Sequence, residues 1–148
     1  MRGTPHVSVI SGTYAAISPA KGGKMPNLSK QSVTPNTQGP GTEWAGELDG
    51  YSVSIVAVKG DTDLTPLLKG LAGDQCPSPH WGYVFKGRIW FRDGDTEEKF
   101  GPGDAFYVAP GHTAGADGGS EFVTFSPAEV MREVEAHMMR RAQEMHGG

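Results

Sequence analysis

The sequence predicts an all-β domain followed by one C-terminal α-helix. Three observations predict this fold class. The 148 residues include 22 glycines and 11 prolines, as in chains with many short strands and turns. Turn signals separate β-favouring segments about every 8 to 12 residues, the spacing of sandwiches and barrels. One long helical pattern then closes the chain, and the length suits a single domain with its own hydrophobic core.

Residues 1–42 differ in composition from the rest of the chain. They contain no Asp or Glu, four Lys or Arg, and many small and turn-forming residues. We interpret them as a basic N-terminal arm ahead of the domain, because a single arginine and no amphipathic helix argue against a targeting segment. Residues 6–10 and 13–17 are strand-like, so the arm could pair with the edge of a sheet, its own or a partner's.

Residues 43–125 are predicted to form the β domain. The segment 62–71 leaves two alternatives open, a short helix or a bent strand, because its leucines recur at steps of three and four over only ten residues. Lys86 and Gly87 separate two aromatic-rich segments, which predicts a β-hairpin. Strands this short and evenly spaced are typical of a jelly-roll barrel. The predicted strands are 51–58, 81–85, 88–91, 97–100, 105–109 and 121–125.

Residues 126–148 are predicted to form an amphipathic helix. Ser126 is expected to be its N-cap, Pro127 suits the first helical position, and Glu129 completes a capping box. The apolar residues that follow recur at steps of three and four, so this helix should dock on the β domain. The stripe consists of Met131, Val134, Met138, Ala142 (or Arg141) and Met145.

The stretch 74–87 holds the only cysteine together with a histidine and a carboxylate. Here the sequence resembles the cupin family, whose first motif reads G-x5-H-x-H-x3or4-E-x6-G. Gly87 matches the last glycine, His80 stands at the position of the glutamate, and Cys76 and Asp74 stand at the positions of the two histidines. The leading glycine of that motif falls on Leu68.

The second cupin motif, G-x5-P-x-G-x2-H-x3-N, resembles residues 103–118. Gly103 and Gly111 match it, whereas Ala109, Ala114 and Gly118 replace its proline, histidine and asparagine. The resemblance implies a cupin-type jelly-roll β-barrel that binds a small organic molecule, and it favours a homodimer, which is common in this family.

A metal site follows if the chain keeps the cupin register. Asp74, Cys76 and His80 would then share one strand face, and His112, two residues before Ala114, would point to the same interior. Thiolate, imidazole and carboxylate ligands suit zinc or iron, and the thiolate favours zinc. The alternative is a buried thiol and hydrogen-bonded imidazoles without metal, since two prolines in 77–79 disturb the strand that the parity assumes.

Alternation within the strand predicts two different faces. His80, Gly82 and Val84 share one of them, and the aromatic residues at 81, 83 and 85 share the other. A face this apolar needs a cover, which the arm, the C-terminal helix or a second subunit could supply. We expect a homodimer that uses this face, the arm or the C-terminal helix. In the alternative register the aromatic residues would fill the core and His80 would face solvent.

The sequence is compatible with two classes of function. The protein could be a metal-dependent enzyme acting on a small organic molecule, or a binding or sensing module without metal. A net charge of −4 argues against nucleic acid as a partner. No apolar run approaches the roughly 20 residues needed to span a bilayer, so no membrane association is expected. A single cysteine suits a reducing compartment, and we expect a cytoplasmic protein.

Overall fold

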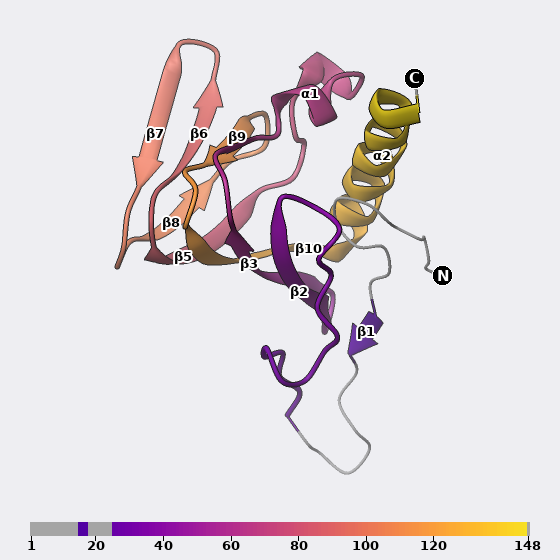
Figure 1. The fold of residues 1–148 in the computed structure, drawn as a ribbon, viewed down its shortest axis with the longest axis vertical. Coiled ribbons are helices and arrows are strands. Elements are labelled where there is room, and N and C mark those ends of the chain that lie inside the picture. Colours follow the sequence, from indigo (N-terminus) through magenta and orange to yellow (C-terminus); the bar gives the residue numbers. More distant parts are fainter. Residues whose placement is uncertain (1–14, 18–24, 148) are drawn as a thin grey trace.

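The computed structural model describes residues 15–17 and 25–147 of the chain. They form two β-sheets with a long C-terminal helix beside them (Figure 1). The hairpin of β6 (Ile89–Asp93) and β7 (Thr96–Phe100) extends on one side of the molecule, and the C-terminal helix α2 (Ala128–Gly147) stands on the other. The predicted fold class, mostly β with a C-terminal helix, is therefore confirmed.

The larger sheet has six strands. Its neighbours pair antiparallel except for the first two, which are parallel. The predicted pairing of the arm with a sheet edge is confirmed for its second strand-like segment, while residues 6–10 lie outside the described part of the chain. The order is β1 (Ala15–Ile17), β2 (Gly41–Leu48), β3 (Tyr51–Val58), β10 (Glu121–Pro127), β5 (His80–Lys86) and β8 (Ala105–Val108).

The smaller sheet has four strands, all antiparallel. No strand pairing between described residues joins it to the larger sheet, so backbone hydrogen bonds do not close the two sheets into one barrel. The order is β4 (Thr62–Asp63), β9 (Thr113–Ala116), β6 (Ile89–Asp93) and β7 (Thr96–Phe100).

The main hydrophobic core lies between the sheets, where Val84 of β5 and Phe106 of β8 meet Ile89 and Phe91 of β6. Val84 is fully buried, whereas the side chains of its sequence neighbours 83 and 85 are 41% and 49% exposed. This alternation confirms the predicted facing of the strand, with the aromatic residues outside. The alternative register, in which they fill the core, is wrong.

The predicted hairpin across Lys86 and Gly87 is wrong. Both strands exist, but β5 lies between β10 and β8 in the larger sheet while β6 lies between β9 and β7 in the smaller one. Gly87 adopts a φ of +82°, and the hydroxyl of Ser120 accepts from the backbone N–H of Arg88 and donates to its carbonyl. The turn therefore carries the chain from one sheet to the other, where each strand finds partners distant in sequence.

Both alternatives for the segment 62–71 are present in part. The short strand β4 is followed by a one-turn helix, α1 (Thr65–Leu68), with Pro66 in its first turn, and then by the 3-10 helix η1 (Ala72–Asp74). Leu68 is buried and packs with Val134 and Met138 of the C-terminal helix. α1 therefore serves as part of the surface on which that helix docks.

The C-terminal helix, α2 (Ala128–Gly147), begins one residue later than predicted. Ser126 and Pro127 are the last residues of β10. The predicted N-cap is wrong, because the Ser126 hydroxyl lies 2.6 Å from Nδ1 of His80 and serves that ring instead.

The docking of α2 is confirmed. Val134 and Met138 are buried and Met131 packs against them, whereas Met145 near the helix end is 50% exposed. No helix in the described part of the chain is long and apolar enough to cross a membrane.

Candidate metal centre

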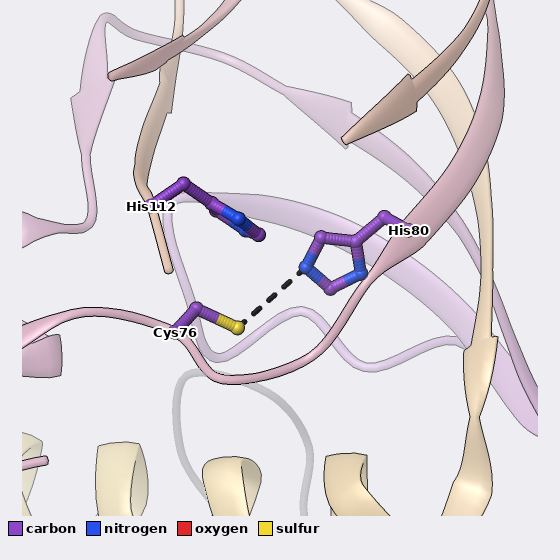
Figure 2. A group of neighbouring side chains, drawn as sticks. All are labelled: Cys76, His80 and His112. Atoms are coloured by element: carbon purple, nitrogen blue, oxygen red, sulfur yellow. Dashed lines mark hydrogen bonds between the residues drawn. The ribbon is translucent and has the colours of Figure 1, made fainter. Parts of the chain in front are cut away.

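Three side chains from separate segments converge between the sheets and α2 (Figure 2). They are Cys76, His80 and His112, and one possible ligand atom from each lies within 4.8 Å of the others. The predicted convergence of these three residues is therefore present. We call them the Cys-His-His group.

Cys76 is held by a two-bond backbone bridge to the loop that carries His112. Its N–H donates to the carbonyl of His112 at 2.7 Å, and its own carbonyl accepts from Gly111 N–H at 2.7 Å. Gly111 needs its φ of +93°, which side chains of other residues disfavour, to turn the loop into this bridge. The bridge places the thiol and the His112 imidazole on neighbouring backbones although they are far apart in sequence.

His80 is the first residue of β5 and points inward. Phe125 of β10 pairs with Trp81 in the antiparallel sheet. Ser126, which follows Phe125, therefore lies beside His80, which precedes Trp81. The Ser126 hydroxyl binds Nδ1 at 2.6 Å, and Nε2 lies 3.6 Å from Sγ of Cys76. The strand register therefore fixes the ring so that Nε2 faces the thiol.

His112 is almost fully buried, at 2% exposure. Its Nδ1 lies 2.7 Å from the carbonyl oxygen of Ala109, and because a carbonyl only accepts, Nδ1 carries the proton. Nε2 is then an unprotonated acceptor, and it is buried with no hydrogen-bond partner among the described residues. A buried polar atom without a partner is rare in folded proteins and calls for a ligand.

Burial keeps all three groups uncharged in the free protein. It lowers the pKa of His80 to about 3, and the neighbouring His112 adds to this effect. Burial also lowers the pKa of His112, although the Ala109 carbonyl and Asp93 oppose it. The pKa of the Cys76 thiol is raised to about 11, chiefly by burial. Neutral imidazoles are the form that binds metal ions, and a metal ion displaces the thiol proton when it binds.

The group fits a first-row transition metal in its donor set and in its supporting hydrogen bonds. Ligands bound to zinc at about 2.0–2.3 Å lie about 3.4–3.6 Å apart, and the Sγ to Nε2 distance between Cys76 and His80 is 3.6 Å. The possible ligand atoms of the three residues lie within 4.8 Å of one another. A small side-chain movement would bring all three to bonding distance from one ion. In both histidines Nδ1 is engaged outside the group, the arrangement that orients metal-binding imidazoles.

Asp74, the fourth predicted ligand, is not part of this group. It is exposed and ends η1 with a φ of +57°, and its carboxylate accepts from the Gly70 N–H at 2.9 Å. The parity argument fails here because Asp74 belongs to a helical turn rather than to a strand. Pro77 and Pro79 follow Cys76, and β5 begins only at His80.

The Cys-His-His group lines a cavity of about 200 Å³ between the sheets and α2. Most of the wall is apolar, with Leu64 and Leu68 near α1 and Met131 and Met138 on α2. Several polar residues of this wall were not predicted as site residues, Ser126 and Glu43 among them. Ser126 was assigned to the helix cap, and Glu43 carried no motif that marked it.

No protein-family model matches the sequence, and no curated protein matches it either. Among solved structures, a mutant of Bacillus subtilis oxalate decarboxylase is similar with a TM-score of 0.50 and 14% identity, over 68% of this chain and 29% of that one. A RmlC-like cupin from Shewanella frigidimarina has a TM-score of 0.46 and 19% identity, over 68% of this chain and 93% of that one.

A transcriptional regulator from Vibrio cholerae has a TM-score of 0.39 and 10% identity, over 53% of this chain. The chain thus spans less than half the length of the regulator and of the decarboxylase, at 43% and 29%. The similarity to the decarboxylase, together with the two sheets, decides the fold. The chain has a cupin fold.

Within this cupin fold, the Cys-His-His group departs from the family motif. Cys76 and His80 occupy two motif positions with other residue types, a thiol for a histidine and an imidazole for the glutamate. His112 lies two residues before Ala114, the position of the last motif histidine, and both residues line the cavity. This cupin-fold protein therefore assembles three metal-competent side chains from positions shifted relative to the motif.

Proposed function

We propose that this cupin is a metal-dependent enzyme acting on a small organic molecule in its cavity. Cys76, His80 and His112 would hold one zinc or iron ion through Sγ and the two Nε2 atoms. The observation that carries the proposal is the buried Nε2 of His112, which has no hydrogen-bond partner in the described structure although it lies beside two other possible ligand atoms. A thiolate among the ligands favours zinc.

Three protein ligands leave a coordination position open, as in catalytic rather than structural zinc sites. A divalent ion bound there would supply Lewis acidity, polarising a carbonyl or lowering the pKa of a bound water. The residues of the chain would supply the rest of the site. Ser126 and the Ala109 carbonyl orient the imidazoles, and the apolar wall formed with α2 keeps bulk water from the ligand.

Two further features belong to this proposal. The two sheets would enclose the ligand as a cupin-type jelly-roll barrel. The protein would act as a homodimer that covers the outer aromatic face of the larger sheet. Support for the dimer comes from exposed aromatic residues on three adjacent strands, between 41% and 52% exposed, which are Trp81, Tyr83, Phe85, Tyr107 and Phe125.

The test is metal content of the purified protein, measured by elemental analysis after supplying zinc or iron and removing the excess. We expect about one ion per chain in the native protein and a loss of at least tenfold in Cys76→Ser and His112→Gln. His146→Gln is the matched control, because His146 is exposed in the last turn of α2. Native protein that retains no ion under these conditions would refute the metal assignment.

A second candidate, a binding module without metal, is favoured by one observation. The pKa of the Cys76 thiol is raised to about 11 and the thiol already has the His80 imidazole as a neighbour, so the pair stays uncharged without an ion. In that case the purified protein would be free of metal and would still bind small molecules in the cavity.

A further inference from the structure

Glu43 presents a second polar group inside the cavity, on the wall formed by β2 and β3. The strand register pairs Glu43 with Val56 and Ala45 with Ser54, so Glu43 and Ser54 are diagonal neighbours on the inner face. The Ser54 hydroxyl donates to Oε2 of Glu43 at 2.5 Å. Glu43 and Ser54 both line the cavity.

The second carboxyl oxygen, Oε1, has no such contact. It is buried and has no hydrogen-bond partner among the described residues. Backbone pairing with Asn36 and the diagonal contact with Ser54 hold the residue in place, so the carboxyl group cannot turn to solvent without breaking the latter. Glu43 lines the cavity, and an unpaired buried oxygen of such a residue is satisfied when a ligand supplies the missing partner.

Burial of Glu43 in a wall without basic side chains favours its protonated form. Burial raises the pKa of Glu43 to about 7, against the opposing effect of the Ser54 hydrogen bond. Among the described residues, those lining the cavity include no Lys or Arg, and the other titratable ones are Glu135 on α2 and the three members of the Cys-His-His group. Because Oε2 accepts from Ser54, the proton of the carboxylic acid resides on Oε1, which then is a donor.

We propose that Glu43 recognises the ligand: its protonated carboxyl donates a hydrogen bond from Oε1 to a carbonyl or hydroxyl oxygen of a small, uncharged molecule. This assignment rests on the proposed function only in taking the cavity as the binding site, and it does not depend on the metal. Glu43 is thereby a specificity-determining residue, and it lies on the wall formed by β2 and β3 rather than on α2.

Size and charge narrow the substrate class. A cavity of about 200 Å³ lies below the roughly 300–1,000 Å³ typical of sites for drug-sized ligands, so the molecule is small. The lining residues include two carboxyl side chains and no basic side chain, so an anionic ligand would gain no ion pair from the wall. An uncharged molecule with an apolar body and one oxygen acceptor matches both properties.

Three probes of similar shape separate these properties: cyclohexanone, methylenecyclohexane and cyclohexanecarboxylate. Their dissociation constants would be measured by calorimetry at pH 6 for the native protein and for Glu43→Gln and Glu43→Leu. Glu129→Gln, an exposed carboxyl on α2, is the matched control. Circular dichroism of each variant establishes that it is folded.

We expect native protein and the Glu129→Gln control to bind the ketone about tenfold more tightly than the alkene, and the carboxylate most weakly. Glu43→Leu should lose this preference. Glu43→Gln should keep it, because the amide N–H₂ of glutamine donates in place of the acid. At pH 8.5 the native preference should disappear while that of Glu43→Gln persists, since the amide does not titrate.

Equal binding of ketone and alkene by the native protein, no saturable ketone binding at millimolar concentration, a preference that survives Glu43→Leu, or tightest binding of the carboxylate would each overturn the proposal. Metal content measured on the same samples separates the two proposals. A metal-free protein with a Glu43-dependent ketone preference overturns the enzyme proposal alone, and a metal-loaded protein whose ketone preference survives Glu43→Leu overturns the role of Glu43 alone.

Discussion

At the scale of single residues, the site is made of polar groups that the fold buries and leaves partly unsatisfied. The Nε2 of His112 and Oε1 of Glu43 are two such atoms, and both residues line the same cavity. Most buried polar groups in proteins are paired, so unpaired ones in a cavity point to a ligand. Their pKa values move in the direction that keeps each residue neutral, downward for His112 and upward for Glu43.

Glu43 should make the stability of the protein fall as pH rises. Its pKa is raised from 4.5 to about 7 in the folded state, so between these values the folded chain holds a proton that the unfolded chain releases. By linkage the free energy of unfolding decreases with pH over this window, by at most about 3 kcal/mol at about 1.4 kcal/mol per pKa unit.

This dependence is measured as the difference in unfolding free energy between native protein and Glu43→Gln, by urea denaturation from pH 4 to pH 8. His80 and His112, whose lowered pKa values weaken the fold toward acid, act equally in both proteins and cancel in the difference. We expect the native protein to lose stability relative to the variant as pH rises. A difference that stays constant with pH would show that folding does not raise the pKa of Glu43.

At the scale of elements, local signals predicted the strands but not all of their partners. Burial alternation along β5 and the stripe on α2 follow directly from the sequence, because one face of each element must avoid water. The hairpin at Lys86 and Gly87 was wrong because strand partners are chosen by packing across the molecule. Ser126 was misassigned for the same reason, since its hydroxyl binds a ring 46 residues away.

The turn at Gly87 should be sensitive to any side chain. A Cβ built there would lie 2.2 Å from the Ser120 hydroxyl oxygen, in a backbone with φ of +82°. We expect Gly87→Ala to lower the free energy of unfolding by more than about 2 kcal/mol, because a clash adds to about 1 kcal/mol of backbone strain.

Gly94→Ala and Gly60→Ala are the controls for this substitution. Gly94 has a φ of +61° and open space, so its replacement measures strain alone, and Gly60 has neither constraint. Chemical denaturation should rank the three losses in the order Gly87, Gly94, Gly60. Equal losses at Gly87 and Gly94 would mean that Ser120 does not confine the turn.

At the scale of the whole molecule, the cupin fold was predictable because the motif glycines mark turns. Gly87, Gly103 and Gly111 all have positive φ values in the structure. The Cys-His-His group was predictable in part, since three of the four predicted residues converge and Asp74 does not. Sequence could not place Asp74, because the turn of η1 that carries it outward is set by packing. Glu43 could not be predicted, since only the fold makes it a cavity residue.

The outer face of the larger sheet should hold two subunits together. Trp81 and Tyr107 lie with ring centroids 5.1 Å apart on neighbouring strands, and both are about half exposed. We expect sedimentation equilibrium at micromolar concentration to give a dimer for native protein and a monomer for Trp81→Glu, since a buried carboxylate opposes association. Met145→Glu, on an exposed apolar residue of α2, should leave the dimer intact. A monomeric native protein would contradict this proposal.

We propose that Cys76, His80 and His112 bind one metal ion through sulfur and two nitrogens, and X-ray absorption spectroscopy of zinc-loaded protein can identify these ligands. We expect one sulfur ligand at about 2.3 Å and imidazole nitrogens at about 2.0–2.1 Å, with the sulfur signal lost in Cys76→Ser. A spectrum of native protein with oxygen and nitrogen ligands only, or one unchanged by Cys76→Ser, would contradict it.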